Sequence, residues 1–421
     1  MSDRQPDRSG DRYDLRRELG SGGFGTVHIA YDRVLQREVA LKQLRRDLLD
    51  RDAASQDALR ARLLHEVRIT GQLEHPGIVP VYDLADGPDG AQSYYTMRLV
   101  RGQPLEDAIA AFHARRRHGQ HDPLELPRLL AAVVGICNAI GYAHARGVMH
   151  RDLKPGNVVL GEFGEVVLLD WGLAKVAAAP DGDDEQQATA VRVTADAPHE
   201  TGDGGAVGTP AYMAPEQARG TAGRRTDVYG LGAILFELLT GRAPHEGQDS
   251  DAVLERILLG PTPRARSRAP WVPPALDAIC ARAMARNPEH RYPTPAALAD
   301  DLQRWLADEP VLAFREPFAG RAWRWARRHR AWTVAGAVAA AITVLVTTIA
   351  AVLLARVNER EREARQVAER MREQGLHLAA KFAARTVARE IDVRWRILEA
   401  AAQSAPLAAS LRRLGAAGAA E

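Results

Sequence analysis

The sequence predicts an α+β, bilobal fold: a β-rich N-terminal lobe and a helical C-terminal lobe, followed by one transmembrane helix and a helical C-terminal tail. Three observations support this prediction. Strand-like runs separated by turns fill the chain to about residue 100, and apolar residues at helical spacing dominate residues 105–305. Beyond them, residues 331–354 contain no charged side chain. A chain of 421 residues is long enough for two or three such units.

The first lobe is predicted to hold a small sheet and one main helix. Apolar and β-branched runs between turn-forming residues predict strands at 15–19, 27–31, 38–44, 78–84 and 94–99.

The main helix of this lobe is predicted at residues 55–73. Leu59, Leu63, Val67 and Thr70 recur at spacings of three and four and therefore share one face.

The second lobe is predicted to be mainly helical. Its helices are expected at residues 105–112, 126–145, 228–239, 252–258, 275–284 and 296–305. Two polar insertions interrupt them, at 113–123 and 177–205, and both are expected to be flexible loops.

Composition narrows the classes of function. Hydrophobic residues make up 46% and charged residues 26% of the chain, which is globular rather than disordered composition. The formal net charge of +2 gives no basic field, so no nucleic-acid partner is predicted. Cys137 and Cys280 stand alone in apolar sequence and are predicted to be core residues rather than a disulfide or zinc ligands. Residues 1–12 are polar, without a signal-peptide pattern, and are predicted to be disordered.

A glycine-rich turn lies between the first two predicted strands. Because it joins two strands instead of opening a helix, a nucleotide-covering flap is favoured over a dinucleotide-binding turn, and a plain hairpin turn remains the alternative. Lys42 follows on the third strand, and Glu66 on the next helix is its candidate ion-pair partner. An ordinary surface lysine and glutamate remain the alternative reading of these two residues.

The segment His150-Arg151-Asp152-Leu153-Lys154-Pro155-Gly156-Asn157 resembles the catalytic loop of eukaryotic-like (Hanks-type) serine/threonine protein kinases of bacteria. The resemblance implies that Asp152 accepts the proton of the substrate hydroxyl, Lys154 steadies the γ-phosphate and Asn157 holds a metal ion. Asp170 in Asp170-Trp171-Gly172 matches the second metal ligand, although Trp171 stands where the family has Phe. The implied cofactors are ATP and Mg²⁺, with Mn²⁺ as an alternative. Lys42 and Glu66 complete the implied catalytic set.

The same resemblance implies an ATP pocket between the two lobes. Its residues are Leu19, Gly20, Ser21, Gly22, Gly23, Phe24, Gly25, Val27, Ala40, Lys42, Met97, Leu99 and Val100. Met97 would be the gatekeeper beside the adenine. Arg98 departs from the acidic residue that many relatives carry at this point of the hinge.

Residues 208–216 resemble the end of the family's activation segment, which receives the peptide substrate and is absent from small-molecule kinases. The resemblance pairs Glu216 with Arg291 and makes Asp227 the brace of the catalytic loop. Thr209, together with Lys154, resembles the serine/threonine branch rather than the tyrosine branch.

Arg151 beside Asp152 implies control by phosphorylation, since in such kinases this arginine binds a phosphate on the activation loop. The candidate sites are Thr189, Thr194 and Thr201. The alternative is that these threonines only decorate a polar loop.

The uncharged run is flanked by tryptophans and arginines, as is typical of a membrane-spanning helix. The predicted organisation is a tail at 1–12, a kinase domain at 13–306 (N-lobe 13–100, C-lobe 101–306), a basic juxtamembrane linker at 307–330, a transmembrane helix at 331–355 and an extracytoplasmic helical segment at 356–421. Because ATP is cytosolic, a single-pass protein of the inner cell membrane with a cytoplasmic kinase domain is expected.

Beyond the span, an apolar stripe at helical spacing comprises Leu378, Phe382, Val387, Ile391, Trp395 and Leu398. A dimerising signal helix in a homodimer, the start of a sensor domain and a solvated tail all remain open. The predicted partners are protein substrates and the lipid bilayer. A pseudokinase scaffold without phosphoryl transfer is the alternative function, with Trp171 as its only support.

Overall fold

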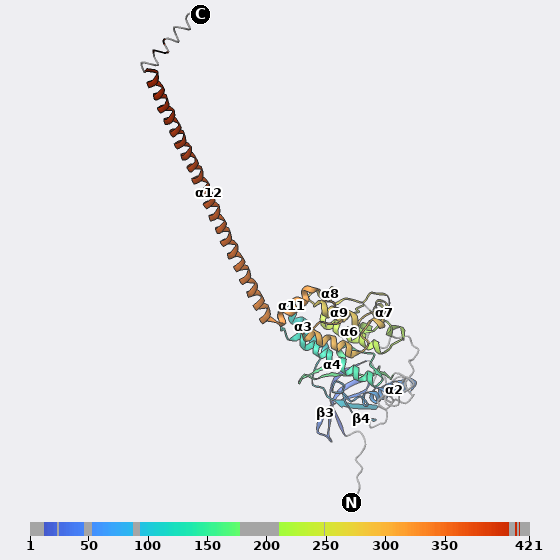
Figure 1. Ribbon diagram of the computed structural model, residues 1–421. Helices are drawn as coiled ribbons and strands as arrows, with labels where there is room; N and C mark the ends of the chain where they lie inside the picture. Colours follow the sequence, from blue (N-terminus) through green and yellow to red (C-terminus); the bar gives the residue numbers. More distant parts are fainter. Residues whose placement is uncertain are drawn as a thin grey trace, which may run out of the picture. The chain divides into compact units, whose positions relative to one another are not determined.

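The computed structural model describes residues 12–22, 25–45, 53–86, 93–176, 210–247, 249–403, 409–410 and 412. It divides into two units, residues 1–318 and 319–421 (Figure 1). The predicted tail at 1–12 lies, except for Arg12, outside the described residues.

The first lobe is a five-stranded antiparallel sheet in the order β1-β2-β3-β5-β4. Its elements are β1 (Tyr13–Ser21), β2 (Gly25–Asp32), β3 (Arg37–Leu44), α2 (Ala53–Thr70), β4 (Val81–Asp86) and β5 (Ser93–Arg98). The five predicted strands and the helix are all present, and the buried side chains of Leu59, Leu63 and Val67 pack α2 against the sheet.

The fourth strand begins three residues later than predicted. Ile78 forms only a single bridge, to Leu168 of the second lobe, and β4 starts at Val81. Pro80 lies between them, and because proline has no N–H it cannot continue a hydrogen-bonded ladder.

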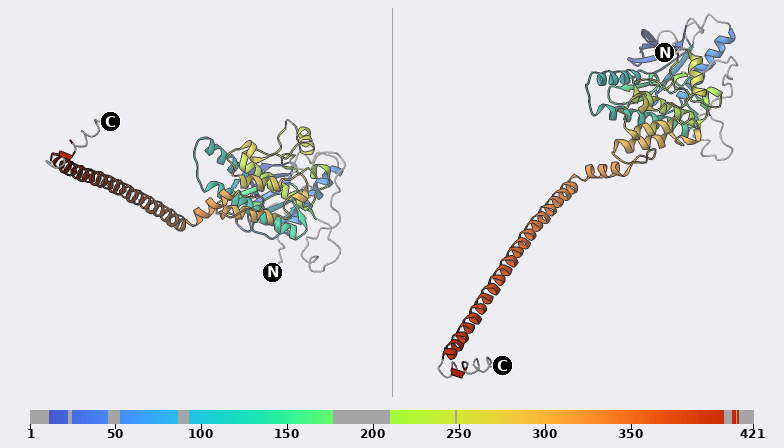
Figure 2. Two further views of the ribbon diagram at one scale, coloured as in Figure 1. Left: turned by 45° about the horizontal axis from the view of Figure 1, so that its top comes forward. Right: turned by 90° about the horizontal axis from the view of Figure 1, so that it is seen from above.

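The second lobe is built from helices α3 (Leu105–Arg117), α4 (Glu125–Ala145), α6 (Arg224–Thr240), α7 (Ser250–Leu259), α8 (Ala265–Arg268), α9 (Pro274–Ala283) and α10 (Pro295–Leu306). Short strands complete it: β6 (Gly102–Pro104), β7 (Val148–Met149), β8 (Val158–Gly161), β9 (Val166–Leu168) and β10 (Lys175–Val176). In both views of Figure 2 the blue strands of the first lobe lie beside the green and yellow helices of the second.

The core of this lobe forms around α4 and α6, whose apolar residues are almost all buried. Cys137 and Cys280 are free thiols inside it, as predicted. The loop predicted at 113–123 is wrong in its first part, because α3 continues to Arg117 and the His113 ring contacts the carbonyl oxygen of Leu238 at 2.9 Å.

The first part of the predicted linker belongs to this lobe. Val311 is buried, and the buried carboxylate of Asp301 accepts hydrogen bonds from the backbone N–H groups of Leu312 (2.6 Å) and Ala313 (3.0 Å). Tyr292 donates to the same carboxylate at 2.7 Å. The chain therefore packs on this lobe as far as Ala313, beyond the predicted domain boundary at 306.

The second unit contains α11 (Phe318–Arg328) and α12 (Arg330–Gln403). The helix α12 is continuous over 74 residues and has no buried residue. Within the described parts of the chain, two helices are long and apolar enough to cross a membrane: α12, and α4, whose apolar residues are already buried in the core. The predicted span at 331–355 thus lies inside one helix with the first part of the predicted tail.

Candidate active site

The segment at 150–157 follows β7 and ends in a short 3-10 turn at Pro155–Asn157. This turn brings the polar side chains of the segment close together. Lys154 donates from Nζ to Oδ2 of Asp152 at 2.8 Å. The Asn157 amide donates from Nδ2 to the backbone oxygen of Asp152 at 2.9 Å. The three residues predicted to carry the chemistry therefore converge.

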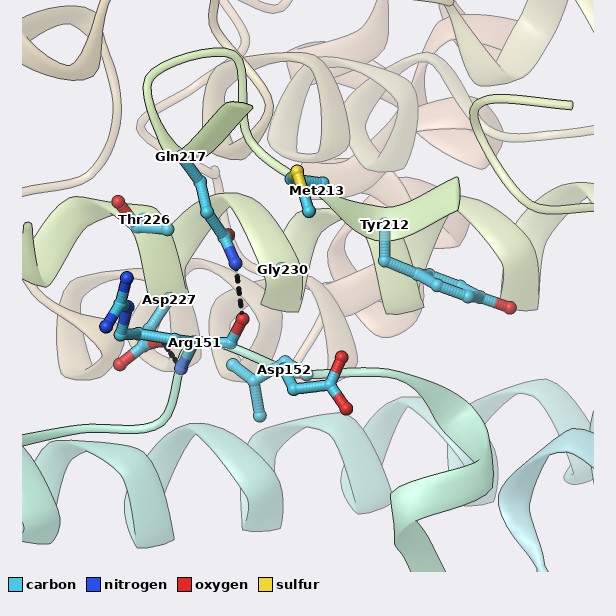
Figure 3. A pocket seen from close by; sticks show the side chains of 9 residues that line it. Arg151, Asp152, Tyr212, Met213, Gln217, Thr226, Asp227 and Gly230 are labelled. Atoms are coloured by element: carbon cyan, nitrogen blue, oxygen red, sulfur yellow. Dashed lines mark hydrogen bonds between the residues drawn. The ribbon is translucent and has the colours of Figure 1, made fainter. Parts of the chain in front are cut away.

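The peptide of Arg151 is held in a conformation that a non-glycine residue seldom adopts. Its φ is 69°, in the left-handed region. Asp227 accepts hydrogen bonds from the N–H groups of His150 (2.9 Å) and Arg151 (2.8 Å), and it contacts the His144 ring at 2.6 Å. Figure 3 shows the bond between Asp227 and Arg151. This places Asp227 where the family resemblance expects a brace.

The Asp227 carboxylate is 1% exposed. Burial alone would raise its pKa, but the hydrogen bonds from His144 and from the N–H of Arg151 outweigh burial, and the pKa is lowered. The carboxylate therefore stays ionised and accepts hydrogen bonds at neutral pH.

Gln217 is a site residue that the sequence analysis missed. Its amide donates from Nε2 to the carbonyl oxygen of Arg151 at 2.7 Å (Figure 3). Together with Asp227, it holds the strained Arg151 peptide from both sides. The signal in the sequence was its place directly after Glu216, but glutamine is common on surfaces and nothing local distinguishes it.

In the first lobe, Lys42 on β3 forms a buried ion pair. Its Nζ lies 2.6 Å from Oε1 of Glu66 and 3.2 Å from Oδ1 of Asp170. Burial would lower the pKa of Lys42, but the two carboxylates outweigh it and the pKa is raised, so the lysine stays cationic. The predicted pair of Lys42 and Glu66 is present.

Tyr95 on β5 is a second residue that the sequence analysis did not single out. Its hydroxyl donates to Oε1 of Glu66 at 2.7 Å, and Tyr95 is 4% exposed. The hydroxyl of Thr70 donates to the backbone oxygen of Glu66 at 2.7 Å. Glu66 is thus oriented toward Lys42 by a neighbour from the sheet as well as by its own helix.

Asp170 follows β9 and also has a left-handed backbone, with φ 54°. Its carboxylate accepts from the N–H of Gly172 at 3.2 Å. Burial acts to raise its pKa, but Lys42 outweighs it and the pKa is lowered. The carboxylate side chain keeps 45% of its surface exposed, so it can reach a bound ion.

Trp171 fills the space behind this turn. It is fully buried, and its ring centroid lies 4.7 Å from that of His150. Its indole Nε1 has no hydrogen-bond partner among the described residues. The apolar plug expected from the family is therefore present in a larger form.

The residues of this site fit a magnesium ion that is held jointly with a nucleotide. Asn157 uses its Nδ2 group for the Asp152 carbonyl, which leaves the amide oxygen as its free ligand atom, and Asp170 offers a half-exposed carboxylate. No group of three or more acidic, histidine or cysteine side chains that could hold a metal is found over the described ranges. Mg²⁺ is commonly bound by one or two protein oxygens plus substrate phosphates, and this site matches that pattern.

Five of the predicted ATP-pocket residues lie in or against one buried cluster of the first lobe. Ala40 and Met97 belong to the buried cluster of the first lobe, and Val27, Leu99 and Val100 pack against it. Gly25 is tightly packed, since a Cβ there would lie 3.0 Å from the Gln43 carbonyl oxygen and 3.2 Å from Cε of Lys42.

Other parts of the predicted pocket are less enclosed. Gly22 donates to the Gly25 carbonyl at 2.8 Å, and the hydroxyls of Ser21 and Thr26 lie 3.3 Å apart. Leu19 is 43% exposed on β1, near Gly20. Gly23 and Phe24 lie outside the described residues.

Glu216, at the end of the segment that resembles an activation segment, forms a buried bidentate ion pair with Arg291. Arg291, whose side chain is 0% exposed, contacts the two carboxylate oxygens of Glu216 at 2.6 and 2.7 Å. Thr226 also donates to Glu216, at 2.9 Å. Burial would raise the pKa of Glu216, but Arg291 outweighs burial and the pKa is lowered. The pairing implied by the resemblance is present.

The unusual Arg98 of the hinge has a partner in the second lobe. Its guanidinium donates to Oε1 of Glu165, in the β8–β9 turn, at 3.0 Å. Arg101 donates in the same region to Glu38 of β3, at 2.9 Å. Both ion pairs join the first lobe to the second, which accounts for a basic residue at position 98.

The predicted phosphorylation sites Thr189, Thr194 and Thr201, and also Thr209, lie outside the described residues.

Comparisons with known proteins give a family. A model described as "Protein kinase domain" matches residues 13–302. Serine/threonine-protein kinase PknD of Chlamydia pneumoniae is 36% identical over 312 residues, which cover 71% of this chain and 32% of that protein. PknD of Protochlamydia amoebophila is 35% identical over 303 residues (70% and 30%), and PknD of Chlamydia trachomatis serovar D is 37% identical over 306 residues (71% and 32%). The chain thus spans about a third of the length of these curated relatives.

Proposed function

The chain belongs to the protein kinase family, and we propose that it is an active serine/threonine-protein kinase that transfers the γ-phosphoryl group of ATP to protein hydroxyls. The observation that carries this proposal is the convergence of Asp152, Lys154 and Asn157, together with the ion pair of Lys42 and Glu66, which reaches the second lobe through Asp170. The relatives are named serine/threonine-protein kinases, which agrees with this specificity.

The proposed reaction assigns one task to each group. The hydroxyl oxygen of the substrate bonds to the γ-phosphorus while the bond from that phosphorus to the bridging oxygen of ADP breaks. Asp152 orients the hydroxyl and accepts its proton, and Lys154, now 2.8 Å from Asp152, is placed to follow the transferred phosphoryl group. Lys42 binds the α- and β-phosphates with a positive charge that Glu66 and Asp170 maintain against the effect of burial.

Asn157 and Asp170 would hold the magnesium ion, or manganese in its place. When bound, that ion supplies charge neutralisation on the phosphates. The lowered pKa of Asp170 keeps its carboxylate ionised and ready to serve as a ligand.

The test compares wild type with Asp152→Asn in a radiolabelled ATP assay on a generic protein substrate. A general base contributes on the order of 10²–10⁴-fold, so incorporation should fall by that factor while the fold is kept. The control is Asp251→Asn, an exposed residue in the first turn of α7. Equal incorporation by wild type and Asp152→Asn would support the pseudokinase alternative instead. Phosphoamino-acid analysis should find phosphoserine and phosphothreonine.

We also propose that the kinase is anchored in the inner cell membrane by residues 331–355, with its catalytic domain in the cytoplasm. The support is an uncharged run at the start of a helix that has no buried residue. Extraction of membranes with carbonate should leave the chain in the pellet, and the catalytic domain should be digested by protease only from the cytoplasmic side. Release into the supernatant would refute the anchor but leave the kinase proposal intact.

Activation by autophosphorylation at Thr189, Thr194 or Thr201 is part of the proposal, because Arg151 stands beside the catalytic aspartate. Mass spectrometry after incubation with ATP should find phosphate there, and an active but unmodified enzyme would contradict it. A homodimer through the apolar stripe of α12 is also proposed, because the side chains of the stripe are exposed. Crosslinking in membranes would test it.

A further inference from the structure

The helix α11 has two chemically different faces. It covers 11 residues, FAGRAWRWARR, at about 100° per residue around the axis. The apolar residues at 318, 319, 322, 323, 325 and 326 fall on one arc. Gly320 and the arginines at 321, 324, 327 and 328 fall on the opposite arc.

The apolar arc is exposed where the structure describes its side chains. Phe318 is 81% exposed and Trp325 is 56% exposed. Two large aromatic side chains exposed on one face of a short helix are typical of a surface that meets a partner or a membrane. Apart from the contact of the Trp325 ring with the His329 ring, whose centroids lie 5.1 Å apart, these two described side chains of the arc are open.

The charge around α11 is of one sign. From Pro317 to Asn358 the sequence contains no aspartate or glutamate, whereas arginine occurs at 321, 324, 327, 328, 330 and 356. Such a surface complements anionic groups, and the net charge of only +2 for the whole chain shows that this is a local concentration.

The position of α11 decides which anionic partner it meets. The backbone N–H of His329 donates to Trp325 at 2.9 Å, and that of Thr333 donates to His329 at 3.0 Å, so α11 is joined directly to the start of α12. The ribbon changes direction between the two helices in both views of Figure 2. If residues 331–355 span the bilayer, the C-terminal end of α11 lies at the lipid headgroups.

We propose that α11 is an interfacial helix that lies on the cytoplasmic membrane surface, with its apolar arc among the acyl-chain boundaries and its arginines on anionic phospholipid headgroups. Helices with separated aromatic and basic faces bind membranes in this way. The proposal rests on the membrane anchor above, and it adds a second, lipid-selective contact. Only Arg315, Glu316 and Pro317 separate α11 from Phe314, which packs on the catalytic lobe.

The experiment uses the full-length protein in nanodiscs. A fluorophore is attached to Ala326→Cys on the apolar arc or to Gly320→Cys on the basic arc. Cys137 and Cys280 are buried and do not compete for the label. In discs that contain phosphatidylglycerol, lipid-borne nitroxide should quench the label at 326, while aqueous iodide should quench the label at 320. In phosphatidylcholine discs the protection of the label at 326 should fall.

Charge variants make the test specific. Replacing Arg321, Arg324, Arg327 and Arg328 by Gln should lower the ratio of protected to exposed label about fivefold per arginine, because each contributes about that factor at an anionic surface. The matched control replaces Arg360, Arg362, Arg365 and Arg370, which lie on the other side of the span, and should change nothing.

Three results would overturn the proposal. The first is equal quenching of the labels at 320 and 326, and the second is equal protection of the label at 326 from iodide in both lipids. The third is protection of that label from iodide in detergent micelles without lipid, which would mean that it packs against protein. Carbonate extraction and a kinase assay on the same samples report the anchor and the activity separately. Failure of the interfacial helix is therefore distinguishable from failure of either proposed function.

Discussion

The two halves of the active site are held in different ways. In the second lobe, the catalytic loop is fixed by a buried carboxylate, Asp227, that is 1% exposed and serves His144 and two backbone N–H groups. In the first lobe, the proposed nucleotide-binding half is built on the ion pair of Lys42 and Glu66, whose side chains are 13% and 6% exposed and which Asp170 and Tyr95 join. We therefore expect the Asp227 network to act mainly on folding of the second lobe, and the Lys42–Glu66 pair to act mainly on nucleotide binding.

Asp227→Ala should have the largest effect. The substitution leaves two buried N–H groups and His144 without their acceptor, and such losses destabilise by about 3–5 kcal/mol. Urea denaturation of the catalytic domain measures this change. Asp249→Ala is the control: Asp249 caps α7 from an exposed position by accepting from Ala252, and its loss should cost about 1 kcal/mol. A loss of stability in Asp227→Ala no larger than that in Asp249→Ala would contradict a role of Asp227 in the folding core.

Lys42→Met should lower the kinase activity far more than it lowers the stability of the domain. Phosphoryl transfer should fall about 10²–10³-fold, as for loss of one strong electrostatic contact to the reacting group. The free energy of unfolding should change by less than about 2 kcal/mol, because Glu66 can be protonated and keeps Tyr95 as a partner. Tyr95→Phe keeps the ion pair and should reduce activity about tenfold or less. Unfolding of Lys42→Met at low denaturant concentration would show that the ion pair of Lys42 contributes to folding, and this would contradict the proposed division of roles.

The second lobe should also respond to pH through His245. This residue is buried against Tyr229, with the hydroxyl and Nε2 2.6 Å apart, and burial followed by the charges of Arg268 and Arg256 lowers its pKa to about 4. The unfolded chain, with a histidine pKa of about 6.5, then binds more protons than the fold. The contribution of His245 to the free energy of unfolding should therefore be fully present above about pH 6.5. It should fall by on the order of 3 kcal/mol toward pH 4.

Denaturation curves of His245→Gln should show a shallower pH dependence in that window, since glutamine can accept from Tyr229 without titrating. His121→Gln, at an exposed position, should keep the wild-type slope. A variant of His245 with the wild-type slope would assign the pH dependence to other groups.

Gln217→Ala should have the smallest effect and sharpen the comparison within the second lobe. Removing the donor to Arg151 should lower kcat several-fold with little change in KM, because the strained peptide next to Asp152 loses one of its two holds. Gln217→Glu, which sets an acceptor against the carbonyl, should lower kcat further. Gln72→Ala removes a similar bond, to Arg68, on the surface at the end of α2 and should leave kcat unchanged. Rescue of kcat by Gln217→Glu would sink the positioning role.

From the sequence we predicted the two-lobed arrangement, the long apolar helix and the candidate pair of Lys42 with Glu66. Helices and strands follow from the periodicity of apolar residues, which is a local property. The roles of Asp152, Lys154 and Asn157 and the pairing of Glu216 with Arg291 came only from a family resemblance.

Tertiary structure alone decided the partners that no local pattern marks. Tyr95 reaches Glu66, Gln217 reaches Arg151, and Arg98 reaches Glu165 over long stretches of chain. Tyrosine, glutamine and arginine are all common on surfaces, so their types do not reveal a buried or bridging role. The docking of residues 311–313 on Asp301 was hidden for the same reason. Hydrogen-bond partners are selected by three-dimensional proximity, which the order of residues along the chain does not specify.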